Sequence, residues 1–295
     1  MSKTLTIRYT SDTHGYLYPT SYADMQDRPM GLMKLASEYP HDGNTLIIDG
    51  GDTIQGSPLT NLYQRLSPEE KAACLTEDTY GTHPIAAMMN LAGYQFVTLG
   101  NHDFNYGVDA LLDYLTNLDA LCLCANIRDK EGRLPIAPYA VHQLENGLRI
   151  GLVGVCTHFV RRWENPKTVE QLVIEEPVPA AKAALEAVKP LCDLTVLIYH
   201  GGFECDLETG KPLTASAENQ ACRMCRELDF DLVLTGHQHM RVDGVHFGNS
   251  FAVQPAYRAP HCCGVTVTVE DDGSKRFESR IIPAEGRPLE CAYNL

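Results

Sequence analysis

The segment Thr45-Leu-Ile-Ile-Asp-Gly-Gly-Asp52 decides the fold of this chain. Its first four residues form a short apolar run with branched side chains, which is typical of a buried strand. The two glycines that follow allow a sharp turn and place Asp52 just beyond the strand. Because ligands of open α/β sheets gather outside the carboxyl ends of the strands, the pattern predicts a functional carboxylate at this edge.

Four other expected strands also run into side chains that can bind a metal. The strands expected at 5–10, 95–99, 193–199 and 231–234 are followed by the motifs Asp12-Thr-His14, Gly100-Asn-His-Asp103, His200-Gly-Gly202 and Gly236-His-Gln-His239. In extended backbone, residues i and i+2 point to the same side, so an Asp-x-His or His-x-His pair directs two ligands to one place. One such motif is weak evidence, but five at successive strand ends predict one common site.

The expected metal ligands are seven side chains: Asp12, His14, Asp52, Asn101, His200, His237 and His239. Carboxylate, imidazole and amide ligands favour manganese, iron or zinc over calcium. Seven ligands are too many for one transition metal with an open position, but they suit two metals that share a bridging ligand. Two divalent ions bring more positive charge than two aspartates neutralise, so the sequence predicts a two-metal phosphoesterase.

The rest of the chain alternates expected helices and strands. Helices are expected at 31–39, 59–66, 83–91, 108–118, 179–188 and 216–228, and further strands at 45–48, 121–124, 136–142, 148–155, 263–269 and 276–282. The turn Asn146-Gly147 predicts a hairpin between the strands at 136–142 and 148–155. This order indicates an α/β fold with mixed sheets, and the absence of a repeat or linker favours a single domain over residues 1–295.

The composition excludes some classes of protein. The 295 residues include 24 basic and 38 acidic side chains, for a net charge of −14, which disfavours a protein that binds duplex nucleic acid. A small anionic substrate is still allowed, because bound divalent cations reverse the field locally. No apolar stretch is long enough to span a membrane and none resembles a signal peptide, so a cytoplasmic protein is expected. The oligomeric state is left open.

The eleven cysteines are expected to be packing residues. Several lie inside apolar stretches, as Cys122 and Cys156 do, where a thiol behaves as a small hydrophobic side chain. Cys222-Arg-Met-Cys225 has the spacing of a zinc or redox motif, but no second pair accompanies it. Cysteine usage therefore indicates a reducing compartment.

Together the motifs resemble the calcineurin-like metallophosphoesterases over nearly the whole chain. The resemblance implies a four-layer αββα sandwich, with two mixed β-sheets packed face to face and helices outside. Within that superfamily, five segments resemble the 2′,3′-cyclic-nucleotide 2′-phosphodiesterase branch of the 5′-nucleotidase family: Gly51-Asp-Thr-Ile-Gln-Gly-Ser-Pro58, Gly100-Asn-His-Asp-Phe-Asn-Tyr-Gly107, Trp163-Glu-Asn-Pro166, His200-Gly-Gly-Phe-Glu204 and Gln254-Pro255. The Ser/Thr protein phosphatases are disfavoured, because their Asp-Arg after the Gly-Asp element is missing.

The resemblance also implies a role for each site residue. One metal would be held by Asp12, His14, Asp52 and His239, and the other by Asp52, Asn101, His200 and His237, with Asp52 bridging. His102 would be the general acid that protonates the leaving oxygen, with Asp103 as a second catalytic residue that orients it. Typical 5′-nucleotidases have an aspartate where this chain has Asn105, which favours the cyclic-nucleotide branch and leaves the orienting partner open.

A nucleotide is the expected substrate, and five residues near the motifs are expected to contact it: Asn101, Phe104, Asn105, Tyr106 and Phe203. For the aromatic residues among them, and for Phe159, Trp163 and Tyr257, stacking on a base and packing in the core are both open. Arg161 and Arg162 either steer a phosphate or are ordinary exposed cations. The C-terminal nucleotide-binding domain of relatives is expected to be absent, since too little sequence follows Ile282.

The expected function is hydrolysis of 2′,3′-cyclic nucleotides, followed by removal of the 3′-phosphate. A 5′-nucleotidase or nucleotide-sugar hydrolase on the same fold is the first alternative. A binding module that has lost catalysis is the second.

Overall fold

The structure is a computed structural model that describes residues 2–24, 26–73 and 83–289. Its largest sheet has seven strands, in the spatial order β15 (Lys275–Pro283), β14 (His261–Val269), β1 (Lys3–Thr10), β2 (Thr45–Asp49), β3 (Phe96–Val97), β4 (Leu121–Leu123) and β6 (Ile136–Ala137). The strands from β1 to β6 are parallel, whereas β14 is antiparallel to both β1 and β15. The sheet is therefore mixed, as the sequence predicts.

A second sheet of six strands has the order β12 (Arg241–Phe247), β13 (Ser250–Pro255), β11 (Leu232–Thr235), β10 (Leu194–His200), β8 (Arg149–Cys156) and β7 (Tyr139–Gln143). Its four central strands are parallel and both edge strands are antiparallel. The pairing of β7 with β8 confirms the predicted hairpin. Two short strands, β5 (Ile127–Asp129) and β9 (Leu172–Ile174), form a separate pair that the sequence analysis did not predict.

Apolar side chains from both large sheets fill the space between them. Leu5, Ile7 and Tyr9 of β1 face this space, and Ile150 and Leu152 of β8 face it from the other side. All five are fully buried. The alternation along β1 is the period of two that a strand needs to present one face to a core.

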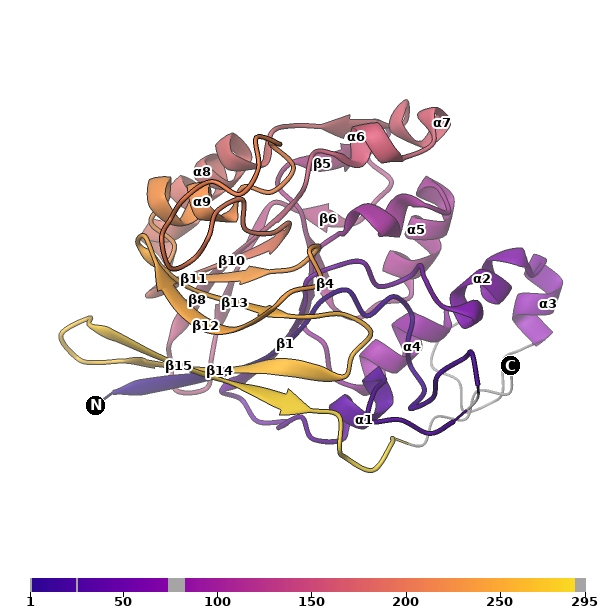
Figure 1. The fold of residues 1–295 in the computed structure, drawn as a ribbon, viewed down its shortest axis with the longest axis horizontal. Coiled ribbons are helices and arrows are strands. Elements are labelled where there is room, and N and C mark those ends of the chain that lie inside the picture. The colour runs from indigo at the N-terminus through magenta and orange to yellow at the C-terminus, as the bar shows by residue number, and fades with distance from the viewer. Residues whose placement is uncertain (1, 25, 74–82, 290–295) are drawn as a thin grey trace.

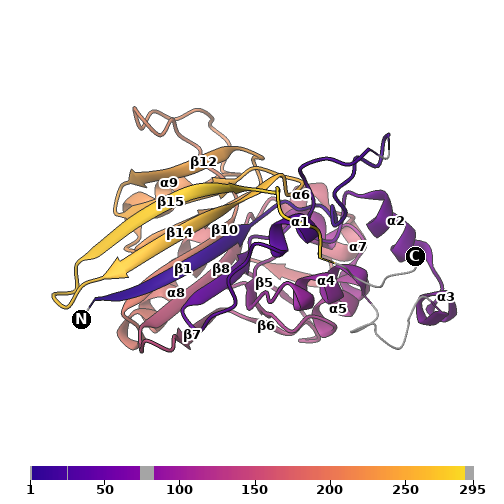
Figure 2. The ribbon, with the colours of Figure 1, turned by 90° about the horizontal axis from the view of Figure 1, so that it is seen from below.

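Helices cover the outer faces of both sheets. On the second sheet, α8 (Pro177–Val188) packs through Leu185 and α9 (Ala221–Glu227) through Met224. On the first sheet, α4 (Pro84–Leu91) packs through Met88 and α5 (Val108–Thr116) through Leu111. In Figure 1, α8 and α9 lie above the six-stranded sheet, while β1, β14 and β15 lie below it. Figure 2 shows these last three strands side by side, reaching beyond the helices. The four-layer αββα fold is thus confirmed.

The helices of the described residues are α1 (Leu32–Ala36), α2 (Pro58–Arg65), α3 (Pro68–Ala73), α4 (Pro84–Leu91), α5 (Val108–Thr116), α6 (Val160–Trp163), α7 (Pro166–Val169), α8 (Pro177–Val188) and α9 (Ala221–Glu227), with 3₁₀ turns η1 (Asn101–Phe104) and η2 (Lys189–Leu191). The helix expected at 216–228 begins five residues later than predicted. Residues 216–220 are instead a loop whose backbone is held by side chains, for example the Tyr199 hydroxyl that accepts from Gln220 N. Even α8, with 12 residues, falls short of the ~20 residues of a membrane-spanning helix, and the same holds for every helix of the described segments.

The cysteine prediction needs one correction. Cys122 and Cys156 are buried free thiols, as expected, but Cys205 and Cys222 are joined by a disulfide bond. Cys222 thus pairs across 17 residues of sequence rather than with Cys225 in its own helix. The cysteine pattern therefore gives no support to the expected reducing compartment.

The N-terminus of α4 contains a buried histidine that makes folding sensitive to acid. His83 is the N-cap, and its Nδ1 accepts a hydrogen bond from Ala86 N at 3.4 Å. The ring packs between Tyr63 and Tyr114, with centroid distances of 4.8 and 5.3 Å. Burial lowers the pKa of His83 to about 3, and Asp113 opposes this shift only in part.

We expect the free energy of unfolding to fall as the pH drops from about 6.5 towards 3, because the unfolded chain binds a proton on His83 that the folded chain rejects. The slope from this one group is at most about 1.4 kcal/mol per pH unit. His83→Asn keeps a side chain that caps the helix but cannot titrate, so its urea-measured stability should decline less steeply. His41→Asn, at an exposed position, is the control. Equal slopes for all three proteins would contradict the assignment.

Candidate metal centre

The loops after β1, β2 and β11 hold their polar side chains in strained backbone conformations. Five of the seven expected ligands lie in the left-handed region, with φ of 56° for Asp12, 50° for His14, 57° for Asp52, 72° for His237 and 56° for His239. Such conformations are rare for residues other than glycine and cost energy, so they persist where function requires them. Here they turn each side chain back across the end of its strand.

Direct contacts between backbones bring these loops together. Asp12 N donates to Gly51 O at 2.8 Å, and His14 N donates to Asp52 O at 2.9 Å. Gly51 itself has a φ of 90°, and a Cβ at this position would lie 2.3 Å from Gly100 N. Only glycine allows so close an approach of the two loops, which explains the Gly-Gly-Asp sequence.

The first cluster consists of Asp12, His14 and His239. The Nε2 atoms of His14 and His239 lie 3.1 Å apart, and His239 Nε2 lies 3.5 Å from Asp12 Oδ1. His14 Nδ1 is 2.9 Å from Gln55 O, so a carbonyl fixes this ring and leaves Nε2 for the cluster. A metal-binding histidine is commonly oriented in this way through its other nitrogen.

The second cluster consists of Asp52, His200 and His237. His200 Nδ1 is held by Gly50 O at 2.7 Å, while Nε2 lies 3.2 Å from Asp52 Oδ2. His237 Nε2 is 2.8 Å from Glu218 Oε1, which leaves its Nδ1 as the ligand atom. Burial alone would lower the pKa of His200, but the charge of Asp52 outweighs this effect and raises it. Burial likewise opposes the charge of Asp52, but His200 outweighs that effect and lowers the pKa of Asp52. A divalent cation bound here would take the place of the positive charge on protonated His200.

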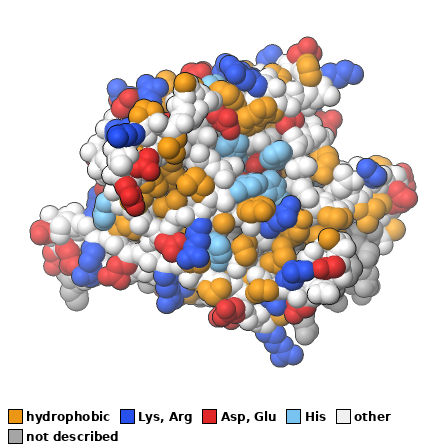
Figure 3. All heavy atoms as spheres, viewed as in Figure 1, with side chains coloured by type: hydrophobic (Ala, Val, Ile, Leu, Met, Phe, Trp, Pro, Cys, Tyr) orange, Lys and Arg blue, Asp and Glu red, His pale blue; other side chains and the backbone are white. Residues whose placement is uncertain are grey.

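The donor atoms fit two divalent metals. Within each cluster the ligand atoms lie within 4.8 Å of one another. Asn101 begins η1, and its Oδ1 is buried with no hydrogen-bond partner among the described residues. An unsatisfied buried amide oxygen is costly unless a cation or a water binds it. Six of the seven expected side chains thus lie in two groups that could each hold a metal ion, and Asn101 adds a buried oxygen without a partner among the described residues. Figure 3 shows histidine side chains gathered near the middle of one face.

His102 stands beside these ligands but is oriented by a different residue from the one expected. Its Nδ1 lies 2.8 Å from Asn105 Oδ1. The carboxylate of Asp103 instead accepts hydrogen bonds from four backbone N–H groups, those of Asp52, Thr53, Ile54 and Gly100. The expectation that Asp103 orients His102 is therefore corrected, because its oxygens are used by the backbone.

Sequence reasoning missed two glutamates of this site. Glu164 Oε1 accepts a hydrogen bond from Asn105 Nδ2, so the chain of contacts runs from His102 through Asn105 to a carboxylate. Burial raises the pKa of Glu164, while nearby His102 and the Asn105 contact oppose the rise. Glu164 lies inside the Trp163-Glu-Asn-Pro166 segment, but nothing in the sequence links it to Asn105. Glu218 was missed because it lies in the segment 216–228, which was expected to be a helix.

The family comparison agrees with this geometry. Residues 5–241 match the family described as Calcineurin-like phosphoesterase. The chain is a calcineurin-like phosphoesterase. It thus belongs to a family of hydrolases, and both the recognised resemblance and the predicted fold are confirmed.

Relatives of this calcineurin-like phosphoesterase have two kinds of name. The 2′,3′-cyclic-nucleotide 2′-phosphodiesterase/3′-nucleotidase of Salmonella typhimurium is 26% identical in an alignment 313 residues long, and this alignment covers 97% of this chain and 46% of the relative. The 5′-nucleotidase of Vibrio parahaemolyticus is 27% identical over 240 residues, or 79% of this chain and 39% of the relative. A solved putative 5′-nucleotidase from Staphylococcus aureus has a TM-score of 0.82 at 28% identity, and the match covers 99% of this chain and 56% of that one. The chain spans less than half the length of the two curated relatives.

Two of the expected substrate contacts are core residues in this calcineurin-like phosphoesterase. Phe104 is fully buried in the layer between the first sheet and its helices, and Phe203 is 2% exposed beneath α9. Neither ring reaches the surface, so both expectations are corrected. Phe159 is likewise buried, and the guanidinium of Arg162 lies over its ring in a cation–π contact. Arg161 donates to Ile174 O.

Two other aromatic residues flank the two clusters. Trp163 is 45% exposed and stacks on His237, with ring centroids 5.4 Å apart. Tyr257 is 38% exposed and stacks on His239 at 4.3 Å, with the rings 6° from parallel. Tyr106 is half-buried and lines a separate hollow with Gln55 and Arg65. Trp163 and Tyr257 are therefore the aromatic side chains that lie on the ligands themselves.

We expect Asn105→Ala to lower turnover of an alkyl phosphoester about tenfold to a hundredfold with metal content unchanged, because the His102 ring loses its orientation. Asn105→Asp should also be impaired, since it would set a carboxylate against Glu164. Adding Glu164→Gln restores a donor opposite that carboxylate, so the double variant should recover turnover relative to Asn105→Asp. Wild-type turnover in Asn105→Ala would show that Asn105 has no positioning role.

Proposed function

We propose that the chain hydrolyses nucleotide phosphoesters, and that its substrate is a 2′,3′-cyclic nucleotide opened at the 2′ position and then freed of its 3′-phosphate. The observation that carries the proposal is that two groups of three possible metal ligands, with the buried oxygen of Asn101, lie beside His102. A binding module without catalysis would not require His102 to be held by Asn105 next to two metal clusters. The names of the Salmonella and Vibrio relatives support a nucleotide as the substrate class.

We assign Asp12, His14, Asp52 and His239 to one metal and Asp52, Asn101, His200 and His237 to the other, with Asp52 shared. When bound, two divalent ions lower the pKa of water, polarise the phosphoryl group and clamp both sides of an in-line displacement. The mixture of imidazole and carboxylate ligands favours manganese, iron or zinc. Glu218 keeps the His237 ring in place through Nε2, as carboxylates do around metal-binding histidines.

His102 supplies the proton in this proposal. Because Asn105 occupies Nδ1, the proton to be transferred is on Nε2, which is the nitrogen left for the substrate. It passes to the ribose oxygen as that oxygen separates from phosphorus, so the product leaves as a hydroxyl group. The backbone N–H of His102 donates to Asp52 Oδ1 at 2.7 Å, which ties the acid to the shared ligand.

A hollow of about 330 Å³ beside the second cluster is where we place the nucleotide. Its lining residues are Asn101, His102, Asn105, Trp163, Glu164, Glu218, His237 and Gln238. Trp163 is the exposed aromatic side chain of this wall and is suited to stack on a base. Asn101 and His102 also line the hollow, and we place the phosphate beside them.

A 5′-nucleotidase is the second candidate. The names of the Vibrio relative and the Staphylococcus structure favour it. The neutral amide of Asn105, where typical 5′-nucleotidases have an aspartate, favours the cyclic-nucleotide activity.

The test is hydrolysis of 2′,3′-cyclic AMP, 3′-AMP, 5′-AMP and bis-p-nitrophenyl phosphate by the manganese-loaded protein. We expect turnover of the cyclic substrate, and about a hundredfold or greater loss in His102→Ala at unchanged metal content. The p-nitrophenyl ester should lose less, because its acidic leaving group departs without a proton. His41→Ala is the control at an exposed position.

Other outcomes discriminate between the alternatives. Turnover of 5′-AMP without turnover of the cyclic nucleotide would replace the proposal with a 5′-nucleotidase. Two bound metals with no hydrolysis of any of the four esters would contradict catalysis altogether.

A further inference from the structure

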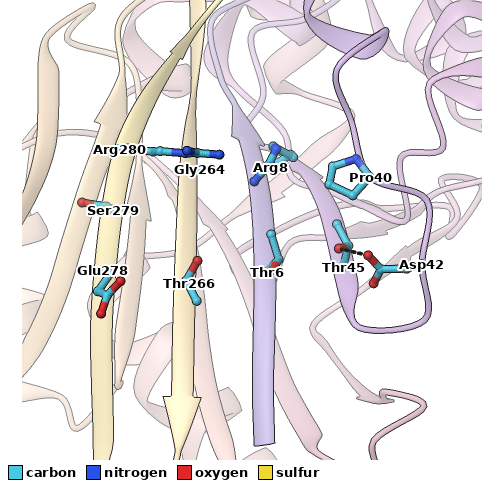
Figure 4. Close-up of a pocket in the computed structure, with 10 residues that line it drawn as sticks. All are labelled: Thr6, Arg8, Pro40, Asp42, Thr45, Gly264, Thr266, Glu278, Ser279 and Arg280. Carbon is cyan, nitrogen blue, oxygen red and sulfur yellow. Dashed lines mark hydrogen bonds between the residues drawn. The ribbon is translucent and has the colours of Figure 1, made fainter.

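A pocket of about 420 Å³ lies on the outer face of the seven-stranded sheet and shares no residue with the metal centre. It is formed by β15, β14 and β1 and by the loop that leads into β2, as Figure 4 shows. Two rows of side chains cross it. One row pairs Arg8 with Gly264 and Gly264 with Arg280, and the next pairs Thr6 with Thr266.

Gly264 makes room for two guanidinium groups to approach each other. A Cβ at this position would meet Arg8 Nη1 at 3.3 Å and Ile282 Cδ1 at 2.6 Å. In Figure 4 the Arg280 side chain lies across β14 at Gly264, on the side of Arg8. Two like charges thus converge over one strand, which is unfavourable without an anion between them.

Arg8 lacks the partners that a buried cation needs. Arg8 is only 8% exposed, its Nε has no hydrogen-bond partner among the described residues, and Nη1 makes one long contact of 3.4 Å to Ile7 O. Within residues 2–24, 26–73 and 83–289, no carboxylate forms an ion pair with Arg8 or Arg280. Buried charges are normally paired, so hydrogen-bond donors that are unpaired and face a pocket indicate a ligand.

The two acidic residues of the pocket make other contacts, and although the charge of Asp42 acts on Arg8, it opposes only part of the lowering of the Arg8 pKa by burial. Asp42 accepts from Asn44 N at 2.8 Å and from the Thr45 hydroxyl at 3.1 Å. Glu278 Oε1 lies 3.7 Å from Nε of Arg276, a residue that does not line the pocket. The free donors are therefore the two guanidinium groups, with the hydroxyls of Thr6 and Thr266 beside them.

We propose that this pocket binds a phosphate group, held between Arg8 and Arg280 over Gly264. A tetrahedral dianion matches the two positive charges and can accept from both planar guanidinium groups at once. The volume leaves room for an organic group attached to the phosphate. The inference is independent of the function proposed above, because the site is separate from the metal ligands.

Isothermal titration of the manganese-loaded chain with inorganic phosphate tests the proposal. Phosphate is also expected at the metal centre, so the readout is the difference between the wild type and each variant. Arg280→Gln, at an exposed position, and Arg8→Met should each remove one binding event or weaken it about tenfold to a hundredfold. Arg276→Gln removes the same charge from the same strand outside the pocket and should bind as the wild type does.

A second titration, with a phosphonate analogue of AMP that cannot be hydrolysed, identifies the source of the phosphate. Tighter binding of the analogue at the Arg8 pocket assigns it to organic phosphates, and equal binding assigns it to the free anion. The proposal is overturned if Arg280→Gln binds phosphate as the wild type does, or if Arg276→Gln weakens binding equally. Arg280→Gln decides the matter even where Arg8→Met does not fold.

Discussion

The carboxylate of Asp103 is the constraint on which the metal centre depends. It is buried at the start of η1 and accepts four backbone hydrogen bonds, three from the Asp52–Ile54 turn and one from Gly100. These bonds join the loop after β2 to the loop after β3, at the point where Gly51 and Gly100 nearly touch. Burial and the neighbouring Asp52 raise the pKa of Asp103, and the hydrogen bonds from the N–H groups of Gly100, Ile54 and Thr53 offset part of this rise.

The two-sheet core allows the centre to be strained. Side chains of β1, β2, β8, β10 and β11 interlock between the sheets, so the ends of these strands cannot move apart. The ligand residues can then be held in the left-handed backbone conformation, although it is locally unfavourable. Backbone hydrogen bonds also join Asp12 and Asp52 to neighbouring loops. His102 and Asn101, which lie on η1 with Asp103, come into place through the same bonds.

The sequence predicted the parts of this arrangement that depend on local patterns. Apolar runs that end in Gly-Asp, Asp-x-His or His-x-His mark strands and their ends, and so the sequence predicted the fold and the six side chains that the structure brings together in two clusters. Contacts between residues far apart in the sequence could not be predicted from local patterns. Examples are the hydrogen bond between Asn105 and Glu164, which are 59 positions apart, and the disulfide between Cys205 and Cys222, which are 17 apart. Phe104 and Phe203 show the same limit, because an aromatic residue beside a motif looks alike in the core and at a surface.

In the proposed centre, Asp52 would be a ligand of both metal ions. Electron paramagnetic resonance of the chain loaded with manganese, with the bound metal counted per chain, tests this most directly. We expect two ions per chain and the spectrum of a spin-coupled pair, and Asp52→Asn should weaken or abolish that spectrum. One ion per chain, or two that give only the spectrum of isolated Mn²⁺, would contradict it.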